Sequence, residues 1–528
     1  MAAGVAVLAL GAHLLFSGIG FNPTDEGFTL AGARRILAGQ IPHRDFISTR
    51  PAFSFLLHVP EVWLGGQSIL LNSRLVFWLE MAVGALGWVL LLEWACRKTF
   101  TSMVRLALLG TVFSLNTHIF PPMAWHSVDA MTLAALGLAL VARSRRAGKF
   151  AGYAILGLST LCRQNFIPIL PVALFVFGDA RRMGCWIAAM APVIAYAAVI
   201  SIAGGWNDMI LQLAARTDIV GLGFAPFAAH KGTWFGLATG LLSALLVTGV
   251  RPGKPRLPGL FEAGIGLSTG TVLFAVSGLA CGTIAAEPAF FVWGAAAGVG
   301  AFKAFMDAGR SRAPILIATA GWCIGVSVGY NTPALMAGAC AAVMVVMVVD
   351  ALGRRHPHVA RLLVTMFAVI SLVAMAWARR IFVYRDCPAP ALTVDLGTVF
   401  PGGRGIRTGS ETGRFLADLA FVVKRCGGHP YAIIPDCAAW WATAPSSNPI
   451  CEDWPMNAEL VRPELFMRVG KDLLRQRGRI YVIVQKYRAE SIATERRMIG
   501  DDRMYGVVAL ARKAFSKTGE TEFFEIYH

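Results

Sequence analysis

The sequence predicts a mainly α-helical protein that crosses a membrane many times and ends in a small α/β domain. First, 56% of its 528 residues are hydrophobic, and apolar runs of about 17–25 residues recur, the length that a helix needs to cross about 30 Å of hydrocarbon. Second, these runs are continuous, which excludes the alternating pattern of a transmembrane β-barrel. Third, the last 150 residues are charged throughout and contain no such run.

Thirteen segments have the character of spans and make up the first predicted domain, residues 1–378. The first run lacks a basic start and a small-residue cleavage site, so we expect a retained span rather than a signal peptide. The predicted spans are residues 4–20, 73–95, 102–120, 127–142, 150–162, 166–178, 184–204, 232–250, 261–282, 288–306, 314–330, 333–350 and 362–378.

Basic residues gather at one end of these spans, since each cluster follows an even-numbered one. By the positive-inside rule this places the N-terminus in the cytoplasm, and thirteen spans then place the C-terminus outside. The net charge of +17 therefore reflects membrane orientation rather than nucleic-acid binding. The clusters are Arg97–Lys98, Arg143–Lys149, Arg181–Arg182, Arg251–Arg256, Arg310–Arg312 and Arg354–Arg361.

The fifth and sixth predicted spans are short for a full crossing, and only Arg163, Gln164 and Asn165 separate them. A polar turn at membrane depth is tolerated where protein rather than lipid surrounds it. We therefore expect this turn to be buried inside the helical bundle.

Residues 379–528 read as a separate extracytoplasmic α/β domain, with a helical pattern from Pro463 to Arg475. Four of the ten cysteines lie there, an even number in an oxidising space, and Cys437 with Cys451 is the disulfide that we expect. Short β-rich runs are Tyr431–Ile434, Ile480–Val484, Val507–Ala511 and Phe523–Ile526.

The loop after the first span, residues 21–67, concentrates polar and charged residues from Asp25 to Pro51. Thr24 can cap a helix whose first turn holds Asp25 and Glu26, with Gly39 as its stop signal. Carboxylates in a first turn favour the helix dipole and need no further function. However, this helix would begin at the outer membrane face, so the alternative is that Asp25 is a catalytic base.

The loop also resembles a known family. The pattern D-E-G after the first span, then A-R-R-I-L-A-G-Q-I-P-H-R-D-F and a later R-P, is similar to the first outer loop of the GT-C glycosyltransferases. That superfamily includes the protein O-mannosyltransferases and the lipid A aminoarabinose transferases. His43 stands where many relatives carry an aromatic residue. The layout of many spans with an outer C-terminal domain is similar more loosely.

This resemblance implies a membrane glycosyltransferase of the bacterial inner membrane, with a periplasmic C-terminal domain. Such enzymes move a sugar from a polyprenyl-phosphate carrier to a hydroxyl of a lipid, glycan or protein acceptor, with inversion. Asp25 would be the general base, which must reach the attacking hydroxyl to within about 2.6–3.2 Å. Glu26 and Asp45 would orient the acceptor or keep Asp25 ionised through Arg44.

A lipid phosphate as leaving group needs cations. Arg163 is the first candidate, because its position resembles the basic residue that contacts the carrier phosphate in this family, and Arg44 and Arg50 lie in the first loop. A planar guanidinium suits bidentate phosphate binding. The alternative for Arg163 is an interfacial side chain that reaches to lipid headgroups.

The segment from His118 to Asp129 adds His126 and an aromatic residue at the outer face. Two histidines eight residues apart across two prolines are a weak metal signature, so we predict no cofactor, leave a divalent metal open, and assign His126 and Asp129 to acceptor contacts. The segment Trp206–Lys231, with Arg216 and Asp218, predicts an amphipathic helix on the membrane.

Two other classes remain open from the sequence. A transporter or lipid flippase would also use many spans and intramembrane charges such as Glu80 and Glu93, but no related halves are visible. A catalytically inactive relative would retain the fold alone. The absence of a phosphate-binding G-x-x-x-x-G-K-[ST] loop agrees with a lipid-linked donor rather than a nucleotide sugar.

Overall fold

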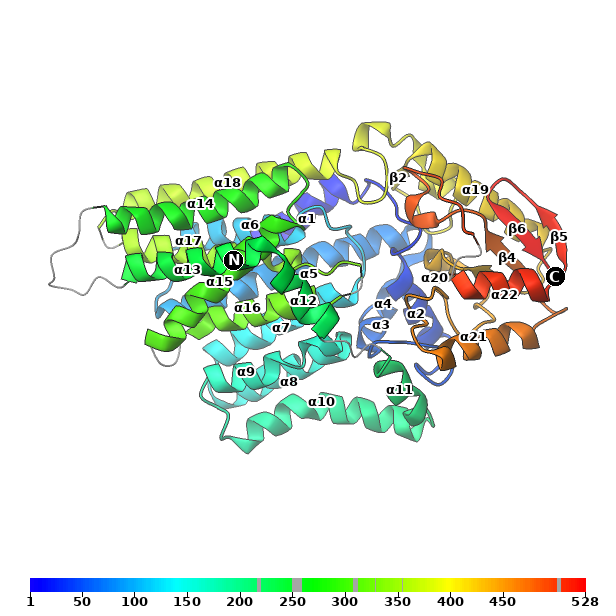
Figure 1. Cartoon of the computed structure of the whole chain (residues 1–528), viewed down its shortest axis with the longest axis horizontal. Helices are drawn as coiled ribbons and strands as arrows, with labels where there is room; N and C mark the ends of the chain where they lie inside the picture. Colours follow the sequence, from blue (N-terminus) through cyan, green and yellow to red (C-terminus); the bar gives the residue numbers. More distant parts are fainter. Residues whose placement is uncertain (216–219, 249–258, 307–311, 328, 354, 501–504) are drawn as a thin grey trace.

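The computed structural model describes residues 1–215, 220–248, 259–306, 312–327, 329–353, 355–500 and 505–528. The molecule is elongated, with a bundle of long helices at one end and a smaller α/β part at the other (Figure 1). The first loop lies between them, where α2, α3, α4 and α20 meet.

Long helices account for most of the first 381 residues. Each of the thirteen predicted spans corresponds to a helix, which are α1 (Ala2–Phe16), α5 (Ile69–Cys96), α6 (Ser102–Thr117), α7 (His126–Arg143), α8 (Arg146–Cys162), α9 (Ile169–Val176), α10 (Met183–Ile202), α13 (Lys231–Thr248), α14 (Leu260–Ala280), α15 (Glu287–Met306), α16 (Ala313–Gly325), α17 (Ala337–Gly353) and α18 (Pro357–Ile381).

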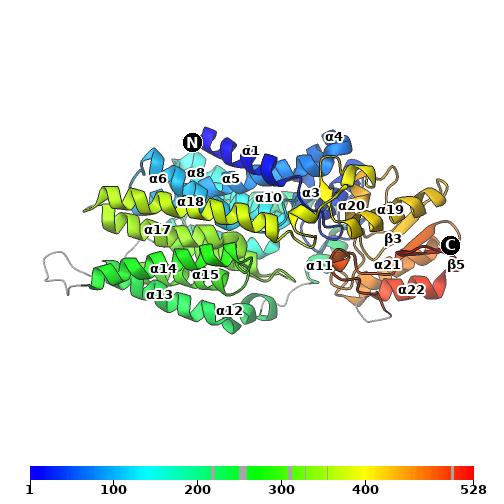
Figure 2. The same ribbon diagram turned by 90° about the horizontal axis from the view of Figure 1, so that it is seen from above.

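Six helical segments of the described residues are long and apolar enough to cross a membrane, and several shorter helices, α1 and α16 among them, are apolar as well. The chain is thus a mainly helical integral membrane protein. A count of thirteen crossings stays a prediction, because α9 has only eight residues and length alone does not decide a crossing. The two views place the long helices roughly side by side (Figures 1 and 2).

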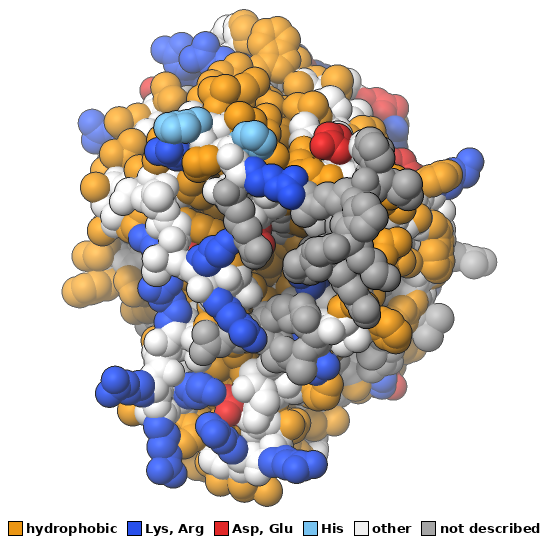
Figure 3. Space-filling model, turned by 90° about the vertical axis from the view of Figure 1, so that its left-hand side faces the viewer, with side chains coloured by type: hydrophobic (Ala, Val, Ile, Leu, Met, Phe, Trp, Pro, Cys, Tyr) orange, Lys and Arg blue, Asp and Glu red, His pale blue; other side chains and the backbone are white. Residues whose placement is uncertain are grey.

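The left-hand end of the bundle carries many Lys and Arg side chains and few acidic ones (Figure 3). This is the charge distribution expected of a cytoplasmic face. The predicted orientation of the termini stays a prediction. The basic cluster Arg251–Arg256, together with Arg310 and Arg354 of two others, lies outside the described residues.

The break between α8 and α9 is buried in protein, as expected from the sequence. Arg163 is 5% exposed, and a single 3-10 turn, η2 (Gln164–Phe166), joins the two helices. Asn165 donates to the Val326 carbonyl at the end of α16, and Gln164 donates to the Thr49 carbonyl in the first loop at 3.2 Å. The break therefore connects the bundle to the first loop.

The first loop contains α2 (Phe28–Leu37), α3 (Phe53–Leu57), α4 (Val59–Gly65) and η1 (Gly66–Ser68). The predicted helix start at Thr24 is wrong, since α2 begins after Gly27, which has a φ of +94°. A Cβ at Gly27 would lie 2.3 Å from the Cα of Ala439. Glycine is required because the turn presses on α20, so Asp25 and Glu26 lie in that turn and not in the helix.

The last part of the chain forms two small sheets with helices around them. Strands β1 (Val394–Asp395) and β2 (Arg407–Thr408) pair antiparallel. The second sheet has the order β3-β4-β6-β5, with a parallel β3–β4 pair and antiparallel β4–β6 and β6–β5 pairs. Its elements are β3 (Tyr431–Ile434), β4 (Tyr481–Gln485), β5 (Lys517–Glu520) and β6 (Phe524–Tyr527), with α19 (Ser410–Arg425), α20 (Ala438–Thr443), α21 (Pro463–Arg475) and α22 (Gly506–Ala514).

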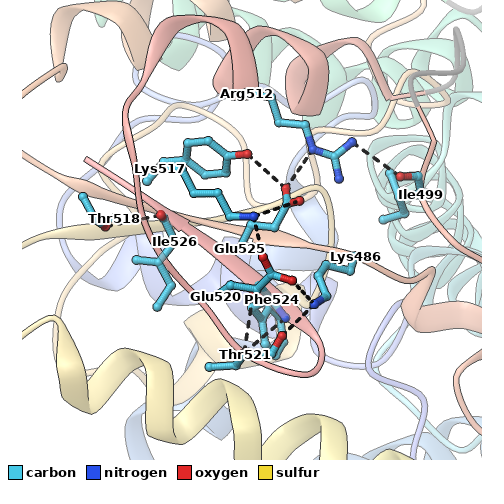
Figure 4. Close-up of polar contacts among 11 residues, drawn as sticks. Lys486, Ile499, Arg512, Lys517, Thr518, Glu520, Thr521, Phe524, Glu525 and Ile526 are labelled. Atoms are coloured by element: carbon cyan, nitrogen blue, oxygen red, sulfur yellow. Dashed lines mark hydrogen bonds and ion pairs between the residues drawn. The ribbon is translucent and has the colours of Figure 1, made fainter.

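Three of the four β-rich runs are strands, and α21 matches the predicted helix. The run Val507–Ala511 is instead part of α22, and the prediction of a strand there is wrong. Val507, Val508 and Ala511 are all fully buried, a spacing that places them on one face of a helix. Arg512, at the end of α22, donates to the Glu525 carboxylate on β6 at 2.8 Å, which fixes the helix to the sheet (Figure 4).

The expected disulfide between Cys437 and Cys451 is also wrong, since all ten cysteines are free thiols. Cys437 belongs to the apolar cluster around α19 and α20, whereas Cys451 belongs to the one around α21 and α22. Both thiols are buried in separate cores. Burial raises the pKa of each thiol.

Candidate active site

Asp25 lies in the buried turn between α1 and α2 and joins the first loop to the segment after α18. Its Oδ2 accepts hydrogen bonds from Asn22 Nδ2 at 2.9 Å, from the Tyr384 hydroxyl at 2.8 Å and from Arg385 Nη1 at 3.0 Å. The side chain is 10% exposed. Three donors on one oxygen fix the orientation of this carboxylate and leave Oδ1, among the described residues, without a hydrogen bond.

Two neighbours of Asp25 have shifted pKa values. Burial lowers the pKa of the half-buried Arg385, but the charges of Asp25 and of three further neighbours together hold it above its usual value. Burial and the Asp25 charge raise the pKa of Tyr384, so this hydroxyl stays protonated and donates. Arg385 also contacts Glu490 at 3.4 Å. A positioned carboxyl group with one open oxygen has the geometry that a general base requires.

A second carboxyl group lies beside Asp25. Asp436 is 3% exposed, and its Oδ1 accepts from the Cys437 amide at 2.5 Å. Burial raises the pKa of Asp436 to about 7, and the charge of Asp25 adds to that rise. Asp436 therefore titrates near neutral pH, next to the carboxyl group of Asp25.

Glu26, predicted with Asp25 as catalytic, has both oxygens bound by Arg74. The two bonds, from Nε and Nη2, are each 2.7 Å long, and both side chains are nearly inaccessible. Arg74 also donates to the Ser17 and Gly20 carbonyls at 2.6 Å. In this conformation the pair holds the turn that carries Asp25, and a direct catalytic role for Glu26 stays a prediction.

A narrow cavity of about 30 Å³ adjoins the turn, and Asn22, Glu26, Arg74, Arg379 and Tyr384 line it. Arg379 Nη2 donates to the Thr117 and Phe120 carbonyls, whereas its buried Nε finds no acceptor among the described residues. The cavity thus brings two guanidinium groups next to the donors of Asp25.

Asp45 and Arg44 pair with each other rather than with Asp25. Arg44 donates to both Asp45 oxygens at 2.8 and 2.9 Å, and Asp45 also accepts from the Ile41 amide. The expectation that Arg44 keeps Asp25 ionised is therefore wrong, since the cation at Asp25 is Arg385. The Arg44 hydrogen bond lowers the pKa of Asp45, and the pair opens on a groove of about 630 Å³ beside Arg468.

Arg50 lies in the first loop and contacts the C-terminal α/β part of the chain. It donates to both Glu459 oxygens at 3.0 and 3.1 Å, and its guanidinium lies 5.7 Å from the ring centre of Phe28. The Phe28 ring also packs against Trp125 and Trp454. Arg50 therefore stands at the edge of an aromatic cluster directly after the Asp25 turn.

Arg163 directly follows α8, and its side chain contacts the start of α7. It donates to Ser127 Oγ, to the Val326 carbonyl at 2.7 Å and to the Ile324 carbonyl at 3.4 Å. His126 is 5% exposed, and its ring lies 4.5 Å from that of Trp125. The structure thus groups Arg163 and His126 at one helix start, while Arg50 reaches the same aromatic cluster through Phe28.

Asp129, predicted with His126 as an acceptor contact, is fully buried and has other partners. Its Oδ1 lies 3.2 Å from His58 Nε2, and His58 Nδ1 lies 2.5 Å from Glu61 Oε1. His118 is separate from this group, because it bonds to the Asn116 carbonyl and to Tyr330. A substrate does not reach Asp129 in this conformation.

The residues that surround Asp25 most closely were missed by the sequence reasoning. Tyr384 and Arg385 directly follow the last predicted span, and a Tyr-Arg pair after a span is also typical of an interfacial belt. Asp436 lies more than 400 residues after Asp25 in an unremarkable segment. Only the predicted outer location of residues 379–528 pointed to a contact with the first loop. Trp440 and Trp441 are core residues of the α/β part.

Comparison with known proteins finds no matching family model and no matching curated protein. Similar solved structures include ArnT from Cupriavidus metallidurans bound to undecaprenyl phosphate, with 13% identity, a TM-score of 0.46 and coverage of 100% of this chain and 98% of that one. The apo state of ArnT gives 11% identity, a TM-score of 0.45 and the same coverage. Arabinosyltransferase EmbB from Mycobacterium smegmatis gives 14% identity and a TM-score of 0.30, over 83% of this chain and 42% of that one. Similarities this low assign neither an activity nor a substrate.

Proposed function

We propose that the chain is a membrane glycosyltransferase that moves a sugar from a polyprenyl-phosphate donor to an acceptor hydroxyl at the outer face of a bacterial inner membrane. Asp25 acts as the general base, and the reaction inverts the anomeric carbon. The proposal combines the resemblance of the first loop to the GT-C enzymes with the surroundings of Asp25. The observation that carries it is the Asp25 carboxylate, which three donors hold by Oδ2 while Oδ1 stays open.

The proposed mechanism uses one proton transfer. The acceptor hydroxyl donates to Asp25 Oδ1, the oxygen attacks the anomeric carbon, and the bond to the carrier phosphate breaks on the opposite face. Arg385 and Tyr384 donate to Oδ2 and hold the base in place, so that Oδ1 is the oxygen that takes the proton. A positioned base typically contributes about 10²–10⁴-fold in rate.

The carrier phosphate is assigned to the guanidinium groups near the start of α7. Arg163 lies there between Ser127 and the end of α16, and Arg50 approaches from the first loop. A guanidinium binds phosphate oxygens in pairs. The aromatic cluster around Phe28 lies beside these groups and suits the apolar face of a sugar ring.

The test of the base is Asp25→Asn in the purified enzyme with its donor. The variant keeps the shape of the side chain, so we expect normal folding and a loss of transfer of at least about 10²-fold. The matched control is Asp350→Asn, which removes a half-exposed carboxylate on α17 that pairs with Lys98. Transfer by Asp25→Asn near the control rate would remove Asp25 from the mechanism.

The test of the phosphate site is binding of undecaprenyl phosphate to Arg163→Ala. We expect Arg163→Ala to bind the lipid at least about tenfold more weakly than the wild type, since charge-assisted hydrogen bonds are typically worth about 1.5–3 kcal/mol. Arg361→Ala, at a partly exposed position near the start of α18, is the control. Unchanged lipid affinity in Arg163→Ala would contradict the assignment.

A further inference from the structure

A buried cluster outside the proposed active site contains three carboxyl groups and one imidazole. His58 lies between α3 and α4, Glu61 is in the first turn of α4, Glu80 is in α5 and Asp129 is in the first turn of α7. His58 and Asp129 are 1% and 0% exposed. Three carboxyl groups thus meet at a single imidazole, and a buried charge without compensation is costly.

Several oxygens of this cluster lack a donor within the described part of the chain. Asp129 Oδ2, Glu80 Oε2 and Glu61 Oε2 are all buried, and no hydrogen-bond donor among the described residues reaches any of them. Buried polar atoms in folded proteins nearly always have a partner. These unpaired oxygens belong to three different side chains that converge on His58. A cation that binds several oxygens at once would satisfy them.

The spacing of the side chains fits a metal ion. One ligand atom each from His58, Glu80 and Asp129 lies within 4.8 Å of the other two. Ligands about 2.0–2.2 Å from Zn²⁺ lie roughly 3–4 Å from one another, so small rotations of the two carboxylates close the set on a cation. His58 Nε2 and Asp129 Oδ1, 3.2 Å apart, already have that separation.

Glu61 supplies the support that such a site needs. Its Oε1 lies 2.5 Å from His58 Nδ1, so it accepts the Nδ1 proton and leaves the lone pair of Nε2 directed at Asp129. Metal-bound histidines commonly donate their other nitrogen to a carboxylate, which fixes the tautomer and strengthens the ligand. The imidazole is thus held with Nε2 toward Asp129, the orientation that a metal ligand at this place needs.

We propose that His58, Glu80 and Asp129 bind a divalent transition-metal ion, with Glu61 as the positioning residue for His58. One imidazole and two carboxylates suit Zn²⁺ or Mn²⁺. The ion joins the end of the first loop to α5 and α7, so its role is to hold the loop that carries Asp25 on the bundle. Its ligands are separate from Asp25, Arg50 and Arg163, which the proposed function uses as base and phosphate contacts, and the proposal gives Asp129 a metal in place of an acceptor.

The competing account is a proton shared between Glu80 and Asp129, whose carboxyl groups lie within hydrogen-bonding reach of each other. A shared proton leaves the protein without a metal ion. The two accounts therefore differ in what the purified, full-length protein contains, independently of any transferase activity.

The test is metal analysis of the protein purified without chelator, followed by Co²⁺ titration after metal removal. We expect about one ion per chain, a visible Co²⁺ absorption band and a lower melting temperature after chelation that Zn²⁺ restores. Asp129→Asn and His58→Asn should lose the band. Glu61→Gln should keep the fold and weaken metal affinity roughly 10–100-fold.

The matched control is His358→Asn, which removes an exposed histidine on α18. It should retain the ion and the band. A wild-type protein with no ion, no Co²⁺ band and no shift of melting temperature would overturn the proposal in favour of the shared proton. Full metal content in both Asp129→Asn and His58→Asn would overturn it as well, because the ion would then lie elsewhere.

Discussion

Replacing Arg74 by methionine is expected to destabilise the protein by about 3–5 kcal/mol, because removing one partner of a buried ion pair leaves the other charge buried and unpaired. The Arg74 and Glu26 side chains are 2% and 4% exposed, so solvent screening does not reduce this estimate. Arg74 also binds the Ser17 and Gly20 carbonyls, which lose their donor in the variant.

The assay is a double-mutant cycle of Arg74→Met and Glu26→Gln, measured by equilibrium unfolding in detergent. Each single change should destabilise, and the double variant should recover part of the loss, with a coupling of about 1–3 kcal/mol. Arg361→Met, a change at a partly exposed position on α18, serves as the control. An Arg74→Met effect below about 1 kcal/mol, or strictly additive effects, would refute this account of the turn.

Three further outcomes are expected. Burial raises the pKa of Asp436 from 3.8 to about 7, so the folded state holds this proton more tightly than the unfolded state. Stability should therefore fall as the pH rises from about 4 to about 7. Asp436→Asn should flatten that part of the plot of melting temperature against pH, and an unchanged slope would contradict the role of Asp436. Gly27→Ala should destabilise more than Gly39→Ala, because both have positive φ but only a Cβ at position 27 meets Ala439; equal effects would contradict the close approach. Reducing agent should leave the melting temperature unchanged, because all ten cysteines are free, and a clear drop would reveal a disulfide.

The helical part could be predicted closely from the sequence, because lipid requires continuous apolar helices of known length. The buried turn at Arg163 was predictable for the same reason, since a polar turn at that depth needs protein around it. Helix α2 was placed three residues too early, because Thr24 has the chemistry of a helix cap, whereas the contact of Gly27 with Ala439 decides the actual start. Such a contact between distant segments leaves no local signal.

The candidate site could be predicted only in part. Asp25 was found from its loop, but Arg385 and Asp436 reach it from the last third of the chain, and pairing between distant segments depends on the tertiary fold. For the same reason Arg44 was assigned to Asp25, although Asp45 next to it in sequence is its partner. The strand predicted at Val507 failed because a short apolar run fits a buried strand and a helix equally well.

The most direct test of the proposed function is mass spectrometry of the lipids of native cells in which Asp25→Asn replaces the wild-type protein. If Asp25 is the base of a glycosyl transfer from a lipid carrier, one polyprenyl-phosphate sugar should accumulate, and its mass identifies the donor. An unchanged pool of lipid-linked sugars, with another lipid or solute in the wrong compartment, would contradict the transferase and favour a transporter.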